Sequence, residues 1–78
     1  MKYKLYWVKW VDATMSSGWM PAKDYEVVPN YIESVGWVIK ETKDYICLAL
    51  SWSTLNQIAD VMEIPKRWIK GKKRLHLK

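Results

Sequence analysis

The chain has 78 residues, half of them hydrophobic, and a formal net charge of +5 at pH 7. This length predicts one small domain spanning residues 1–78, whose core supplies only about 3–5 kcal/mol of net stability. The single cysteine, Cys47, excludes an intramolecular disulfide, and the longest apolar run, Tyr45 to Leu50, is much shorter than the roughly 20 residues that cross a bilayer. We therefore expect a cytoplasmic protein with no membrane span.

The positive charge is concentrated at one end of the chain. Residues 1–65 carry six lysines and eight acids, whereas residues 66–78, called here the basic C-terminal segment, carry seven lysines or arginines and no acid. Such an asymmetry is typical of proteins that bind a polyanion, and it is equally expected of a solvated tail that only keeps a protein soluble. The sequence leaves these two interpretations open.

The first third of the chain predicts a strand, a loop and a helical turn. Lys2 to Val11 (KYKLYWVKWV) alternates with a period of two, which is typical of a strand whose two faces are both partly covered. Asp12 to Met20 is rich in serine, threonine and glycine and predicts a loop. Pro21 to Val28 begins with a proline that suits the first position of a helical turn. A short helical connector is therefore expected before the second strand.

The centre of the chain predicts a β-hairpin around which the other strands pack. Ser34 to Ser51 (SVGWVIKETKDYICLALS) contains two apolar runs separated by a charged turn. Val35, Trp37 and Ile39 share one face of the first run, and we expect this face to be covered by the core. The matching residues of the second run are Ile46, Leu48 and Leu50. Gly36 predicts a bulge or a sharp bend of the kind that turns a corner in small barrels.

The last third predicts a polar loop and two more strands. Ser51 to Gln57 is the loop, and Ile58 to Ile64 fits either a strand or a helical turn; we prefer the strand because Pro65 ends the segment after so few residues. A tight turn over residues 65–68 then leads into a final strand, Ile69 to Leu77, with a basic exposed face. Five short strands predict a mainly β fold, a small SH3-like or Sm-like barrel with a short helical turn between strands 1 and 2. The edge strands of so small a barrel also predict a homo-oligomer.

Several strings of the sequence resemble a group of short proteins carried by phages and prophages. They are Trp10-Val11-Asp12 followed by Gly18-Trp19, then SVGWVIKETKDYICLA, then Ile64-Pro65-Lys66 ahead of Ile69, and together they span most of the chain. The resemblance implies an accessory protein of the host-cell cytoplasm. It is also compatible with the small anti-defence proteins (the anti-CBASS sponge type) that sequester a cyclic nucleotide signal.

Residues suited to catalysis or to metal binding form no recognisable pattern. His76 is the only histidine and has no Cys, Asp or Glu at ligand spacing. The three glycines are isolated from one another, so the chain has no glycine-rich phosphate loop. Cys47 alternates with its neighbours inside a predicted strand and fits a buried apolar position better than a reactive thiol. We expect a protein that is not an enzyme and that needs no cofactor or metal.

Tryptophan and tyrosine are abundant, with six Trp, five Tyr and no Phe. Rings that carry a hydrogen-bond donor suit surfaces that are apolar on one side and wet on the other. Three tryptophans lie within predicted strands and are expected in the core: Trp7, Trp10 and Trp37. The other three lie in or beside loops and are expected at a binding surface: Trp19, Trp52 and Trp68. Trp19 has a second interpretation, in which it folds back as a lid over the core.

This surface best fits a nucleotide or an oligonucleotide, because aromatic rings stack on bases while basic side chains contact phosphates. The predicted ligand-binding residues are Trp19, Ser51, Trp52, Ser53, Thr54, Lys66, Arg67 and Trp68. Together with the phage resemblance, they favour a protein that sequesters a cyclic dinucleotide by aromatic stacking. Two alternatives stay open: Sm-like binding of single-stranded RNA or DNA, and a protein-binding module in which the loop tryptophans anchor an interface with a host protein.

Overall fold

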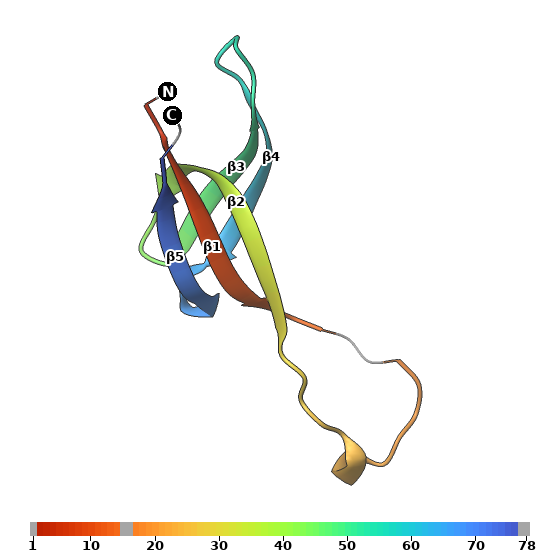
Figure 1. The fold of residues 1–78 in the computed structure, drawn as a ribbon. Coiled ribbons are helices and arrows are strands. Elements are labelled where there is room, and N and C mark those ends of the chain that lie inside the picture. Colours follow the sequence, from red (N-terminus) through yellow and green to blue (C-terminus); the bar gives the residue numbers. More distant parts are fainter. Residues whose placement is uncertain (1, 15–16, 77–78) are drawn as a thin grey trace.

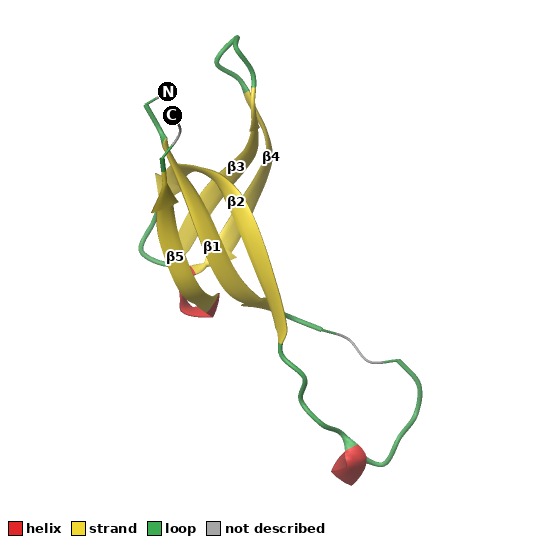
Figure 2. Cartoon of the chain, in the orientation of Figure 1, coloured by secondary structure: helices red, strands yellow, loops and turns green. Residues whose placement is uncertain are grey.

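The computed structural model describes residues 2–14 and 17–76, and most of them lie in one antiparallel sheet (Figure 1). The elements in chain order are β1 (Lys4–Asp12), the 3-10 turn η1 (Ala22–Asp24), β2 (Asn30–Glu41), β3 (Tyr45–Trp52), β4 (Ile58–Pro65), the 3-10 turn η2 (Lys66–Trp68) and β5 (Ile69–Leu75). The two 3-10 turns are the helical elements of the described residues, and Figure 2 shows η1 far from the sheet and η2 beside β5. No helix in the described ranges is long and apolar enough to cross a membrane.

The strands follow the order β4-β3-β2-β1-β5, and each neighbouring pair is antiparallel. This confirms the mainly β class, the five strands and the short helical turn between the first two. The barrel itself is not confirmed, because the sheet is not closed: within residues 2–14 and 17–76, β4 and β5 each pair with one strand only and form its two edges. The last strand ends at Leu75, two residues before the predicted end, and residue 77 lies outside the described residues.

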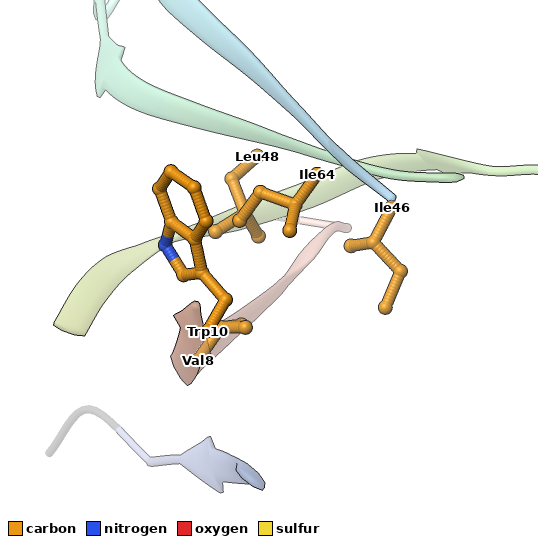
Figure 3. Close-up of a cluster of buried hydrophobic side chains, with 5 residues drawn as sticks. All are labelled: Val8, Trp10, Ile46, Leu48 and Ile64. Carbon is orange, nitrogen blue, oxygen red and sulfur yellow. The ribbon is translucent and has the colours of Figure 1, made fainter. Parts of the chain in front are cut away.

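The core lies on one face of the sheet and joins β1 to the far strands β3 and β4 (Figure 3). Its buried side chains are Val8, Trp10, Ile46, Leu48 and Ile64. Alternate residues of a strand point to the same face. This explains why Val8 and Trp10 of β1 are buried together, and why Ile46 and Leu48 of β3 are buried together. Because β2 lies between these strands in the sheet, the sheet must curve for the side chains to meet.

The prediction that Val35, Trp37 and Ile39 face the core is wrong. In β2 the opposite face meets the core: Gly36 is buried, Val38 packs against the cluster, and Val35 is 47% exposed. A Cβ at Gly36 would lie only 2.8 Å from the carbonyl oxygen of Ala49. Glycine therefore stands on the inner face because β3 passes too close for a side chain. The irregularity in the β2–β3 pairing falls later, between Val38 and Lys40.

A long loop between β1 and β2 extends away from the sheet (Figure 1). We call its described residues, 13–14 and 17–29, the projecting loop. Figure 1 shows η1 near its tip, and the exposed hydrophobic side chains include Trp19, Val27 and Val28. The interpretation of Trp19 as a lid on the core is wrong, since its side chain is fully exposed.

Candidate functional site

The predicted ligand-binding residues fall into three groups that lie in different parts of the molecule. Ser51 and Trp52 end β3, and Ser53 and Thr54 follow in the β3–β4 loop. Lys66, Arg67 and Trp68 form η2. Trp19 lies in the projecting loop. Figure 1 places the β3–β4 loop and the projecting loop at opposite ends of the sheet, so the eight residues do not form a single site.

The serines of the first group shape the β3–β4 loop. The backbone N–H of Ser53 donates to the carbonyl of Gln57 (2.8 Å), and the Ser53 hydroxyl oxygen accepts a hydrogen bond from the N–H of Leu55 (3.1 Å). The Ser51 hydroxyl donates to Oδ2 of Asp60 (3.3 Å). These hydroxyls already have partners within the chain, so a ligand would have to compete with them.

Trp52 belongs to an aromatic cluster rather than to an open loop. Its ring centroid lies 6.1 Å from that of Tyr3 and 6.4 Å from that of Trp37. All three side chains are half-buried. The cluster connects the start of the chain to β2 and β3, which assigns Trp52 a packing role.

The second group, η2, combines a fixed aromatic ring with free positive charge. Trp68 stacks on Trp10 of the core, with ring centroids 6.5 Å apart and an interplanar angle of 14°. Lys66 is held by Glu41, with 2.7 Å between Nζ and Oε2, and its backbone N–H donates to the carbonyl of Asp44 (2.8 Å). Arg67 between them is exposed. The turn therefore presents a guanidinium beside an indole that the core holds in place.

Two surface hollows flank η2, and both are lined by Arg67 and Trp68. The larger one, of about 610 Å³, lies toward the β2–β3 turn and adds Lys43, Tyr45 and Lys66. The smaller one, of about 440 Å³, lies at the base of the projecting loop and adds Asp12, Tyr31 and Lys70. Aromatic rings and cations thus lie on both sides of η2, and each hollow also has one acidic side chain, Asp44 in the larger and Asp12 in the smaller.

Positive charge dominates around η2 and continues along β5. The exposed basic residues of β5 are Lys70, Lys72, Lys73 and Arg74. Nearby, the hydrogen bond and the charge of Lys66, and more weakly the charge of Lys72, hold the pKa of Glu41 below its ordinary value. The carboxylate of Glu41 is therefore ionised at neutral pH and balances Lys66, whereas Arg67 is left to interact with solvent or a ligand.

Sequence reasoning missed several lining residues, among them Tyr31, Lys43 and Tyr45. Tyr45 reaches η2 because β3 pairs with β4 in the register that sets it opposite Pro65. Tyr31 does so because it is paired with Val11 at the end of β1. Neither neighbourhood is visible in the sequence, since each depends on strand register. The abundance of tyrosine was the one sequence feature that could have pointed to Tyr31 and Tyr45.

The described residues contain no group of three or more His, Cys, Asp or Glu side chains that could hold a metal ion. Around η2, aromatic rings and cations lie together at the surface and line the two hollows. Comparison with models of protein families, with curated proteins and with solved structures found no match to this chain.

Proposed function

We propose that this protein is a non-enzymatic binder of single-stranded nucleic acid. One observation supports the proposal: Arg67 and Trp68 line both hollows and stand directly before an edge strand whose exposed residues are basic. Single strands are held without sequence preference by aromatic rings that stack on bases and by cations that follow the backbone. The phosphates would lie along β5, and a base would stack near Trp68.

The same proposal describes the fold as an SH3-like or Sm-like barrel that is partly open. The packing of β1 against β3 and β4 across the intervening β2 supports strong curvature of the sheet. The 3-10 turn η2, placed between β4 and β5, leads the chain from one edge strand to the other. An open edge at β5 leaves its basic side chains accessible to single-stranded nucleic acid.

Salt dependence tests the proposal, with the affinity for a labelled single-stranded oligonucleotide measured by fluorescence anisotropy. Each phosphate neutralised by the protein releases counterions, so log K should fall against log salt with a slope of about −0.7 per contact. We expect several contacts and hence a steep slope. The variant Lys70→Gln should weaken binding and make the slope shallower by about one contact. Lys23→Gln, in the projecting loop, is the matched control and should bind as the unchanged protein does.

A compact cyclic dinucleotide is the second candidate ligand, and the larger hollow favours it. Tyr45 and Trp68 line this hollow together with three cations, and its volume of about 610 Å³ lies within the range of small-molecule sites. The protein would then be a phage accessory protein that sequesters a defence signal in the host cytoplasm. Lys43 lines only the larger of the two hollows and Lys70 only the smaller. Lys43→Gln should therefore weaken the binding of a cyclic dinucleotide, and Lys70→Gln should weaken the binding of single-stranded nucleic acid.

A protein-binding module that inhibits a host protein is the third candidate, favoured by the exposed apolar side chains of the projecting loop. Tryptophan in such a position is typical of binding hot spots. Absorbance of the purified protein separates the candidates. A 260 to 280 nm ratio raised despite six tryptophans would indicate bound nucleotide. A normal ratio, with no thermal shift from nucleotides or oligonucleotides, would favour a protein partner.

A further inference from the structure

The face of the sheet opposite the core carries a second group of aromatic and basic side chains. On β1, Trp7 and Lys9 alternate with the buried Val8 and Trp10 and therefore point to the outer face. Strand register places partners beside them: Val35 and Lys73 flank Trp7, and Tyr31 lies beside Val11. Trp37 lies beside Leu5 further along. We call five of these residues the outer platform: Tyr31, Lys9, Trp7, Lys73 and Trp37.

Trp7 is held in place at both ends of its indole ring. Its Nε1–H donates to Oε1 of Glu33 on β2, at 2.9 Å. At the other end, a Cβ added to Gly71 on β5 would lie only 3.3 Å from Cζ3 of Trp7. The ring therefore lies across β1 from β2 to β5, over the position where glycine leaves room for it. The side chain is half-buried, as expected for a ring with one face on the sheet and the other toward solvent.

Cations stand next to these rings. Lys9 Nζ lies 5.1 Å from the ring centroid of Tyr31, whose side chain is 53% exposed. Lys73 is exposed and paired with Trp7. Glu33 is the acid on this part of the face, and its hydrogen bond to the indole gives it a structural role. The balance of charge on the outer platform is thus positive and suits an anionic chain.

The outer platform is continuous with the η2 site. Tyr31 belongs to both, since it lines the smaller hollow with Trp68 and Lys70. Val11, the partner of Tyr31 on β1, lies four residues from Trp7. Trp7 and Tyr31 are therefore about 13 Å apart along the strand direction. At the far end, Trp37 and Arg74 line another hollow of about 360 Å³. A ligand long enough to contact all of these places must be a polymer.

We propose that the outer platform is a base-stacking surface for single-stranded nucleic acid, with Trp7 as its central ring and with Lys9 and Lys73 as phosphate contacts. This inference rests on the proposed function and extends it from one site at η2 to a path along the sheet. Stacking on a fixed ring needs no base-specific contact. Binding should therefore depend on the length of the strand more than on its sequence.

The test compares oligothymidylates of 4 and 12 nucleotides at one salt concentration, with dissociation constants from fluorescence anisotropy. We expect the 12-mer to bind the unchanged protein more tightly than the 4-mer. Trp7→Leu should weaken binding of the 12-mer by about five- to 160-fold, the ratio that corresponds to loss of one stacked base, and leave binding of the 4-mer unchanged. Trp7→Phe keeps a ring and should retain most of the 12-mer affinity. Circular dichroism confirms that each variant is folded.

Lys73→Gln keeps the proposal testable if Trp7→Leu does not fold. This exposed residue should be replaced without loss of structure, and the variant should lose affinity for the 12-mer and show a shallower salt dependence. Lys23→Gln in the projecting loop is again the control. Equal affinity of the unchanged protein for both oligonucleotides, or a 12-mer that binds all variants equally well, would overturn the platform and leave the η2 site standing.

Failure of both oligonucleotides to bind the unchanged protein would overturn the proposed function as well. A mass in solution that falls to that of a monomer in Trp7→Leu would instead identify the outer platform as an interface between copies of the chain, and would also overturn the proposal.

Discussion

Trp10 is the one tryptophan of the six that is buried, and the core depends on it. It contacts Trp68 of η2 by stacking and donates from Nε1 to the hydroxyl of Ser34 (3.2 Å). Truncation of a buried tryptophan costs about 3–5 kcal/mol, which equals the whole stability expected of so small a domain. Trp10→Ala should therefore be unfolded by circular dichroism at 25 °C. Trp19→Ala, at a fully exposed position, is the control and should unfold at the same urea concentration as the unchanged protein.

Gly36 is a position where even one methyl group should be harmful. Its added Cβ would meet the Ala49 carbonyl oxygen at 2.8 Å, and backbone atoms cannot move aside as the end of a side chain can. Gly71 offers a comparison, because there the nearest atom belongs to the Trp7 ring at 3.3 Å. We expect Gly36→Ala to lower the thermal midpoint more than Gly71→Ala does. A smaller effect at Gly36 would contradict the close approach of β2 and β3.

Glu41 links stability to acid pH through Lys66. The pKa of its carboxyl is lowered by the hydrogen bond and by the charge of Lys66, so the folded protein binds this proton less readily than the unfolded chain does. The contribution is therefore present above the ordinary pKa of 4.5 and is lost as pH falls through the lower folded value. Glu41→Gln should lower the thermal midpoint slightly at pH 7, and this loss should be smaller at pH 3. An equal loss at both values would contradict the ion pair.

The tryptophans show how far alternation in the sequence can predict burial. In β1 it separates the buried Val8 and Trp10 from Trp7, which is half-buried on the outer face, so the prediction of Trp10 in the core is confirmed and that of Trp7 is wrong. In β2 the same rule placed Trp37 in the core and was wrong. Alternation divides a strand into two faces but does not say which face meets the core, and in β2 the glycine on the inner face made that face look weaker.

At the scale of elements, the strands were predictable because prolines and polar turns separate them clearly. Each of the five predicted strands has its counterpart. The positions of loops in space were not predictable, since they depend on strand direction and on curvature. That is why residues in the β3–β4 loop, in η2 and in the projecting loop were assigned to one site. Arg67 and Trp68 stay in the candidate site because η2 itself joins two hollows.

The projecting loop should be dispensable for stability. Asp12 and Asn30 at its two ends are already paired across β1 and β2, and its exposed apolar side chains do not belong to the core. Replacing residues 17–27 with a two-residue linker shortens the loop to roughly half its length, and closing a loop of half the length costs about 0.6 kcal/mol less. The thermal midpoint should stay the same or rise. A fall of several degrees would show that the loop packs on the sheet.

At the scale of the whole molecule, basic and acidic side chains lie at opposite edges of the sheet, which the net charge does not reveal. The edge strand β5 carries four exposed basic residues, whereas the opposite edge, β4, carries the exposed acids Asp60 and Glu63. The sequence did show that the basicity is C-terminal. The sequence did not show that this segment forms an edge strand next to the outer platform. That position depends on the pairing of β5 with β1, which lie far apart in the chain.

Two unpaired edges and an open sheet predict a homo-oligomer. Both β4 and β5 have one hydrogen-bonding side free of other strands in the described residues, and β4 adds exposed apolar side chains at Ile58 and Val61. Such edges pair readily with another copy unless charge blocks them; the four exposed basic residues of β5 oppose pairing there, so β4 is the expected contact. We expect light scattering to give a mass above that of the 9.3 kDa monomer. Val61→Lys should reduce that mass without changing the circular dichroism spectrum, because the side chain is 45% exposed. Thr54→Lys, in the β3–β4 loop, adds the same charge away from the edge and should keep the mass of the unchanged protein.

A mass of 9.3 kDa for the unchanged protein over a wide concentration range would refute self-association. The basic edge at β5 would then be free, along its whole length, for the proposed binding of nucleic acid.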